Sequence, residues 1–417
     1  MAYKINKRKI INDPVYGFIS IPGDLIYDLI EHTWFQRLRN IKQLGLTSFV
    51  YPGANHSRFQ HCLGALHLMD MAIKTLKSKG VEITPQEEEA ALIAILLHDI
   101  GHGPFSHALE NSIINGITHE DLSSLLMEKL DEAFNARLDL AIEIFLGRYR
   151  RKFLHELVSG QMDMDRLDYL RRDCFFTGVI EGSVGSDRII RMLNVADDRL
   201  VIDEKGIYSI EKFLIARRLM YWQVYMHKTV LASESLLVKI LQRAKELALK
   251  GVDMYATPAL SFFLYNQISL DDLKGKGAFT PGYVSANFTR LDDTDILVSV
   301  KYWADHSDKI LSDLSNRLLR RNLLAIELQN DSFPEHRIRE LRTMVRDLMH
   351  IDNGMTEYFV FTNSISNQTY TPDTAEVRIL LKNGITADIS SVSDIFDHRL
   401  LSDRTTKYFL CYPKECR

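Results

Sequence analysis

Residues 96–107, LLHDIGHGPFSH, hold the pattern on which the fold and chemistry of this chain depend. An apolar run typical of a buried helix ends at His98 and Asp99, and Gly101 and Gly103 then allow a tight turn. Adjacent side chains on a helix diverge by about 100°, but at a helix end followed by glycine both can reach one ion. An imidazole nitrogen with a carboxylate oxygen suits Mn, Fe, Zn or Co better than Ca. The string predicts two ligands of a metal site.

Histidine is concentrated around this string. Half of the fourteen histidines lie within residues 56–119, namely His56, His61, His67, His98, His102, His107 and His119. Imidazole is the commonest metal ligand and the usual proton-transfer group near neutral pH. A solvated surface is the alternative explanation. Because a catalytic metal needs three or four ligands, further ligands are expected from other segments.

One such segment lies upstream, in HSRFQHCLG at residues 56–64. Arg58 and His61 are three residues apart and share one face of a helix, so a metal ligand and an anion-binding guanidinium point the same way. Taken alone, His61 could equally be a hydrogen-bonded core histidine.

The downstream segment is DMDRLDYLRRD at residues 163–173. Asp165, Tyr169 and Asp173 form one stripe of a helix, and Asp168 falls about 60° away from it. A solvated charged face would have the same spacing. The spacing therefore leaves open which of Asp165 and Asp168 is a ligand.

A third pattern follows in RRLMYWQVYMHK, residues 217–228, where Arg217, Tyr221 and Tyr225 recur every four residues. A cation and two aromatic rings on one helical stripe match the phosphates, sugar and base of a nucleotide. Packing of the aromatic rings in the core is the alternative reading of the same pattern.

The composition is that of an ordinary globular protein, with 46% hydrophobic residues, 25% charged residues and a net charge of −4 over 417 residues. Intrinsic disorder and a protein coating nucleic acid are both disfavoured, although a local nucleic-acid site stays open. The longest apolar run, residues 90–97, is far shorter than the about 20 residues of a membrane span. Four cysteines without a C-x-x-C pair indicate a reduced, cytoplasmic protein.

The periodicity predicts a mainly α fold. Residues 24–44 are expected to form one helix, and Thr84, Pro85 and Glu87 form the capping box that begins another. Residues 1–325 are treated as one large helical core and 326–417 as a small α+β C-terminal lobe. Strands are expected in four segments of that lobe, at residues 357–366, 375–382, 384–390 and 406–413.

Taken together, these strings resemble the HD-domain phosphohydrolases. The strings HSRFQH, HDIGHGPFSH, THE at 118–120 and DMDRLDYLRRD occur in order, with the motif region at 50–175. Within that superfamily the chain is most similar to the deoxynucleoside triphosphate triphosphohydrolase (dNTPase) branch, and FQRLRNIKQLG at 35–45 extends the likeness upstream. The resemblance covers roughly residues 1–325 and implies an HD-domain helical core.

The resemblance also implies a role for each matching position. It selects Asp165 over Asp168 and implies four metal ligands: His61, His98, Asp99 and Asp165. The implied catalytic residues are His107 at the α-phosphate, Glu110 where the family has an aspartate that orients it, and His119. The implied substrate-binding residues are Gln43, Arg58, His102, Arg166, Tyr169, Asp173, Arg217, Tyr221 and Tyr225. Two of these depart from the family, since Arg166 replaces a lysine and Tyr221 a histidine.

The activity implied by the resemblance is hydrolysis of dNTPs to deoxynucleoside and inorganic triphosphate. The implied cofactor is a divalent transition metal (Mn, Fe, Zn, Co or Ni), with Mg on the substrate phosphates as a second candidate ion. Implied partners are the nucleotide substrate, further copies of the chain and an activating nucleotide at an allosteric site. No membrane partner is expected. The alternatives are another HD-type phosphoesterase (5′-nucleotidase or phosphodiesterase) and a non-catalytic nucleotide-binding protein.

Overall fold

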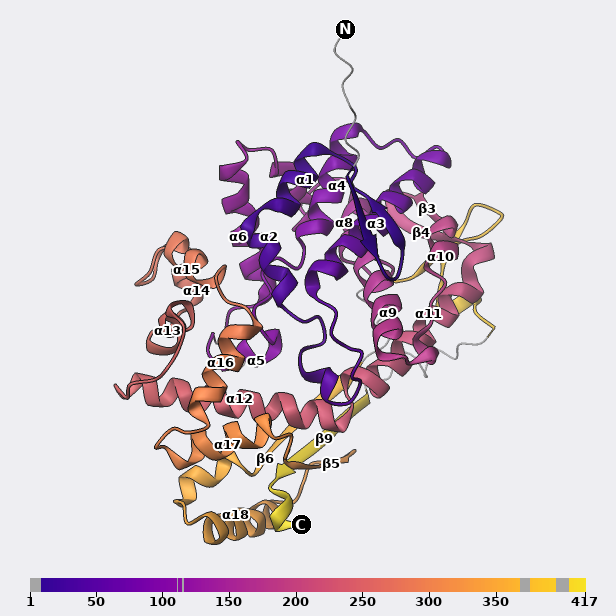
Figure 1. The fold of residues 1–417 in the computed structure, drawn as a ribbon. Coiled ribbons are helices and arrows are strands. Elements are labelled where there is room, and N and C mark those ends of the chain that lie inside the picture. Colours follow the sequence, from indigo (N-terminus) through magenta and orange to yellow (C-terminus); the bar gives the residue numbers. More distant parts are fainter. Residues whose placement is uncertain (1–8, 111, 115, 368–375, 395–404) are drawn as a thin grey trace.

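The computed structural model confirms a mainly α fold with small sheets (Figure 1). It describes residues 9–110, 112–114, 116–367, 376–394 and 405–417, and within these the side chains of residues 106, 107 and 367 are not described. Figure 1 shows the helices of the first half packed together and the long helix α12 crossing the molecule between them and the C-terminal sheet.

The described part of the chain starts with a β-hairpin, which is followed by a helix that ends earlier than the sequence predicts. Strands β1 (Ile10–Asp13) and β2 (Gly17–Ser20) pair antiparallel. The single helix expected over residues 24–44 is wrong, because α1 (Asp24–Glu31) and α2 (Thr33–Gln36) are separated at His32, and two 3-10 turns follow α2. His32 adopts extended backbone, and its Nδ1 accepts a hydrogen bond from the Trp34 N–H as the N-cap of α2.

Helix α3 (Arg58–Ser78) is the centre of the site-bearing region and packs against both α4 and α9. Helix α4 (Pro85–Leu97) begins with the predicted capping box, in which Thr84 and Glu87 each accept a hydrogen bond from the other's backbone N–H. Residues of α4 from Ala90 to Leu97 are all buried. The burial explains why this run is apolar on every face.

The chain turns at residues 98–101 as predicted, and Gly101 also allows a close contact that the sequence did not predict. A Cβ at Gly101 would lie 2.2 Å from the backbone nitrogen of Ser123 and 2.3 Å from the carbonyl oxygen of His119, both in α6. The absence of a side chain at Gly101 is therefore required for the close approach to α6 (His119–Ala133), although its φ angle does not itself demand glycine. This contact brings α6 against the end of α4.

Helix α9 and the helices after it complete the body. Helix α9 (Met164–Thr177) begins at its N-cap Asp163 and ends at Gly178, which has φ +76°. A π-helical turn, Tyr221–Tyr225, separates α11 (Ile207–Met220) from α12 (Lys228–Leu249). The remaining helices are α5 (Ser106–Glu110), α7 (Asp139–Phe145), α8 (Lys152–Val158), α10 (Ser186–Met192), α13 (Pro258–Tyr265), α14 (Leu270–Leu273), α15 (Pro281–Phe288), α16 (Asp293–Trp303), α17 (Lys309–Leu319), α18 (Glu335–Met349) and α19 (Ile389–Val392).

The strands expected near the C-terminus are present, but they belong to two sheets. Strands β5 (Ala325–Gln329), β9 (Thr405–Tyr412) and β6 (Phe361–Asn367) form an antiparallel sheet in that order. The second sheet is ordered β3-β4-β7-β8, with strands β3 (Leu193–Ala196), β4 (Arg199–Asp203), β7 (Arg378–Leu380) and β8 (Thr386–Asp388). Residue 375, the first of one expected strand, lies outside the described residues.

The second sheet links the end of the chain to its middle, because β7 pairs parallel with β4. The predicted domain boundary near residue 325 stays a prediction. Strand β7 lies beyond that boundary, yet it is part of the same sheet as β3 and β4, which precede it. Among the described residues, no helix is long and apolar enough to cross a membrane.

A buried ion cluster ties the hairpin to α9. The guanidinium of Arg172 donates from Nε and Nη2 to the two carboxylate oxygens of Asp168, at 2.9 and 3.0 Å, and from Nη1 to Asp13 at 2.8 Å. The Arg172 side chain is fully buried. Removing one member of such a cluster leaves uncompensated charge in the interior.

We expect Arg172→Met to lower the free energy of unfolding by about 3–5 kcal/mol, because Asp13 and Asp168 lose their shared cation. The control is Arg171→Met on the next residue, whose partly exposed ion pair with Asp187 should contribute less than about 1 kcal/mol. Denaturant unfolding followed by circular dichroism measures both. Equal effects of the two substitutions would contradict the importance of the buried cluster.

Candidate active site

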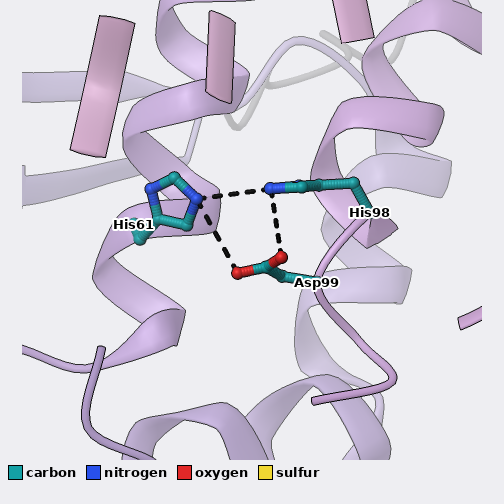
Figure 2. Close-up of side chains that lie close together, drawn as sticks. All are labelled: His61, His98 and Asp99. Atoms are coloured by element: carbon teal, nitrogen blue, oxygen red, sulfur yellow. Dashed lines mark hydrogen bonds and ion pairs between the residues drawn. The ribbon is translucent and has the colours of Figure 1, made fainter. Parts of the chain in front are cut away.

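Three predicted metal ligands meet between α3 and the end of α4. Figure 2 shows the imidazoles of His61 and His98 and the carboxylate of Asp99 directed toward one another. Their ligand atoms all lie within 4.8 Å of one another. The two Nε2 atoms are 3.3 Å apart, and the Asp99 oxygens lie 3.4 Å from His98 Nε2 and 3.8 Å from His61 Nε2.

Asp165, in the first turn of α9, reaches the same point from a third helix. Its Oδ1 lies 3.1 Å from Nε2 of His61 and 3.5 Å from Nε2 of His98. The fourth predicted ligand is thus brought to the other three, because α3 packs against both α4 and α9.

Asp168 occupies the opposite side of His61. Its Oδ2 lies 2.8 Å from Nδ1 of the imidazole, and its carboxylate is held by Arg172. A carboxylate on one ring nitrogen fixes the orientation of the ring and directs the other nitrogen toward the metal position. The two aspartates thus lie on opposite sides of the His61 ring. Asp165 faces the other candidate metal ligands, and Asp168 holds the ring from behind.

The electrostatics of the cluster favour a cation. Burial lowers the pKa of His61, but Asp165 and Asp168 outweigh that effect and raise it to about 10. The pKa of Asp165 is lowered well below its usual range, since its hydrogen bonds to His61 and His98 outweigh burial. Two imidazole nitrogens and two carboxylates converge here, with Asp165 partly exposed, and could hold a divalent transition metal.

Arg58 and His102 surround Asp99. Nη1 of Arg58 donates to Oδ2 of Asp99, and Nε2 of His102 lies 3.2 Å from Oδ1. Burial, together with the charge of Arg58, lowers the pKa of His102 to about 3, so this ring is neutral at physiological pH. The prediction that Arg58 and His61 point the same way agrees with this geometry.

A second group of titratable side chains lies beside the first. The rings of His102 and His119 stack with centroids 4.0 Å apart and planes inclined by 15°. Nδ1 of His119 lies 3.1 Å from Oε1 of Glu110. His107 belongs to α5, but its side chain is outside the described part of the structure, so its predicted pairing with Glu110 stays a prediction.

A cavity of about 780 Å³ adjoins this cluster. It is lined by seven of the predicted substrate-binding residues: Gln43, Arg58, Tyr169, Asp173, Arg217, Tyr221 and Tyr225. Arg166 is not among the lining residues, because its guanidinium turns to Asp163 and the carbonyl of Gly160 at the start of its own helix. Arg58 connects the cavity with the candidate metal ligands, since it lines the cavity and also donates a hydrogen bond to Asp99.

Asp173 organises one wall of the cavity. Its carboxylate accepts a hydrogen bond from the hydroxyl of Tyr225 at 2.7 Å, and Nε2 of His56 lies 2.7 Å from its other oxygen. The ring of His56 is itself stacked on Phe176, with centroids 4.5 Å apart. The ring of Tyr225 meets the rings of Tyr169 and Tyr221 edge to face.

Comparison with known proteins identifies the family of this chain. The HD domain family matches residues 58–173, and the HD associated region matches residues 184–257. A crystal structure of a phosphohydrolase from Bacteroides thetaiotaomicron is 53% identical, with a TM-score of 0.93, and the match covers 97% of this chain and all of that one. The chain belongs to the HD-domain phosphohydrolase superfamily.

Two further relatives show how far the similarity extends. The uncharacterized protein YwfO of Bacillus subtilis is 33% identical over the whole of this chain and 95% of its own length. The deoxynucleoside triphosphate triphosphohydrolase SAMHD1 homolog of Dictyostelium discoideum is 36% identical, over 53% of this chain and 46% of its own length. This HD-domain chain therefore matches less than half of that relative's length.

Sequence reasoning missed the part of the cavity formed by the C-terminal sheet. Five residues of β6 and β9 line it, namely Phe361, Thr362, Asn363, Ile365 and Phe409. No local signal marks them, because they are ordinary strand residues far along the chain from the HD motif. His56 could have been found from the histidine excess, but its role as a partner of Asp173 depends on the packing of α3 beside α9.

We expect the purified HD-domain protein to bind about one divalent transition metal per chain and His61→Ala to abolish that binding, because it removes the central nitrogen. Asp168→Asn should retain the site but weaken metal affinity about 10- to 100-fold through loss of the supporting carboxylate. Elemental analysis and chelator competition measure these effects. The exposed Asp187→Asn serves as the control. Full metal content in folded His61→Ala would contradict the assignment.

Proposed function

We propose that this HD-domain phosphohydrolase converts deoxynucleoside triphosphates to deoxynucleoside and inorganic triphosphate. The observation that carries the proposal is the position of Arg58, which lines the cavity and binds Asp99 of the metal-ligand cluster. A ligand in the cavity is thereby brought beside the candidate metal site. The Dictyostelium relative, whose name states this activity, supports the choice of substrate.

Charge and unpartnered polar atoms define the phosphate end of the cavity. Arg58 and Arg217 present guanidinium groups there, a geometry suited to phosphate oxygens. Nε of Arg58 is buried there without a hydrogen-bond partner among the described residues, and so is Oε1 of Gln43, an acceptor that suits a sugar hydroxyl rather than a phosphate oxygen. Because buried polar atoms are usually hydrogen-bonded, these two favour a polar ligand that completes them.

The tyrosines and Asp173 suit the sugar. Tyr225 is held by its hydrogen bond to Asp173, so its ring cannot easily move away from a bound sugar. A ring fixed in this position would leave no space for a 2′-hydroxyl, which is the basis for a preference for deoxynucleotides.

The reaction breaks the bond between the α-phosphorus and the 5′ oxygen. The oxygen of water forms the new bond to phosphorus, one water proton leaves, and the 5′ oxygen gains a proton. When bound, a divalent cation supplies charge that polarises a phosphoryl oxygen and acidifies nearby water. Arg58 and Arg217 neutralise the triphosphate, while His107 and the Glu110–His119 pair are proposed to hold and transfer the protons, contributing about 10²- to 10⁴-fold.

Product analysis tests this proposal. Metal-reconstituted protein is incubated with each dNTP and NTP, singly and in mixtures, and products are separated by chromatography. Equal amounts of deoxynucleoside and triphosphate are expected, whereas monophosphate or orthophosphate would indicate another HD-type phosphoesterase. Binding without turnover would indicate a nucleotide-binding protein. Turnover only in mixtures would point to an activating nucleotide, and light scattering would show whether activation requires an oligomer.

We expect Tyr225→Ala to lower the preference for dNTP over NTP about tenfold, measured as the ratio of kcat/KM values, because removing the ring makes room for a 2′-hydroxyl. Tyr302→Ala, an exposed tyrosine outside the cavity, should leave the ratio unchanged. An unchanged ratio in Tyr225→Ala would show that another residue excludes ribonucleotides.

A further inference from the structure

The cavity continues well beyond the phosphate end, between α12 and the C-terminal sheet. The residues of α12 that line it run from Val230 to Gln242. At 1.5 Å of rise per residue, this stretch is about 18 Å long. Four residues of β6 line the same cavity, and Phe361 of this strand meets Lys239 of α12.

Strand β6 gives the direction of the cavity. The hydroxyl of Tyr221 donates to the carbonyl oxygen of Ser366 at 3.3 Å, so this end of the strand lies near Arg217 and the tyrosines. Phe361, at the other end of β6, meets Lys239. The two ends are five residues apart, which in a strand is about 16 Å. Lys239 and Phe361 therefore lie at the end of the cavity away from the arginines.

Lys239 is a cation without a counter-ion at that far end. Its side chain is half-buried, and its ammonium lies 5.0 Å from the ring centroid of Phe361 and 5.8 Å from that of Tyr358. No carboxylate or carbonyl within the described ranges forms an ion pair or hydrogen bond with it. Burial lowers the pKa of Lys239. The charge of Glu357 raises this pKa by a smaller amount, and the charge of Arg342 lowers it further.

The surroundings of Lys239 suit a flat heterocycle better than a phosphate. Phosphate sites in proteins usually gather several cations or backbone N–H groups, and the far end offers one ammonium. Its other lining groups are aromatic, aliphatic or amide side chains, among them Phe361, Val238, Gln242 and Asn363. An aromatic wall with a few polar groups at the rim is the usual environment of a bound base.

We propose that Lys239 is a specificity-determining residue that donates a hydrogen bond to a carbonyl oxygen of the substrate's base, with Phe361 of the C-terminal sheet forming the wall beside it. This inference rests on the proposed function and deepens it by naming the class of base. Bases that carry a ring carbonyl are favoured over adenine, which has none. The C-terminal sheet thereby contributes to substrate choice, while the metal cluster lies in the earlier helices.

The test compares two nucleosides that differ at one edge of the purine. Deoxyinosine carries a 6-carbonyl where deoxyadenosine carries a 6-amino group, and neither has a phosphate ester that the enzyme can cleave. Calorimetric titration of the metal-loaded full chain should show deoxyinosine binding about tenfold more tightly, the effect expected of one hydrogen bond from a charged donor. Because nothing is hydrolysed, this result does not depend on turnover.

Three variants separate the role of the ammonium from packing. Lys239→Met keeps the length of the side chain without the donor and should make the two affinities equal, chiefly by weakening deoxyinosine. Lys239→Arg should restore most of the difference. Lys301→Met, at an exposed lysine of α16, should leave it intact.

The outcomes distinguish this inference from the proposed function. Equal affinities in the unmodified protein, an unchanged ratio in Lys239→Met, or failure of both nucleosides to bind at millimolar concentration would each overturn the role of Lys239. Absence of triphosphate release with any dNTP would overturn the proposed function instead, while a nucleoside preference that depends on Lys239 would still stand.

Discussion

The orientation of His61 is the constraint on which the site depends. Its imidazole is fully buried, with Asp168 against Nδ1 and Asp165 beside Nε2. Arg172 balances the charge of Asp168 and extends the cluster to Asp13 in the first hairpin. Without the guanidinium of Arg172, burying the charged carboxylate of Asp168 beside this ring would lower the free energy of unfolding. The position of the metal-facing nitrogen is thus set by a chain of contacts that reaches the start of the described structure.

The same packing brings the chemical groups together. Helix α3 lies against α4 and α9, so its first turn, the end of α4 and the first turn of α9 meet at one point. Arg58 begins α3 and connects this point to the cavity. A long helix, α12, and the C-terminal sheet then close the cavity on its far side. The site is therefore divided between a cluster of side chains that could hold a metal and a cavity lined by later elements of the chain.

Sequence patterns predicted structure correctly where the interacting residues lie within a few positions of one another. The capping box at Thr84 and Glu87 depends on residues three apart, and it formed as expected. The helix expected over residues 24–44 failed at His32, because a histidine that caps the next helix through its ring nitrogen looks no different in sequence from one that continues the first. The reason for Gly101 was also hidden, since the clash it avoids is with α6, about twenty residues later.

Hydrophobic periodicity was enough to predict the mainly α fold, because it follows from residue types at short separations. The superfamily and the choice of Asp165 as the fourth converging side chain came from the resemblance of the motif strings to a known family, since helical spacing alone left Asp165 and Asp168 equivalent. The side of His61 on which each aspartate lies, the turn of Arg166 away from the cavity, and the β6 and β9 lining all depend on contacts between segments up to some hundreds of residues apart. Such contacts arise from the packing of whole helices and sheets, and spacing along a single helix carries no record of them.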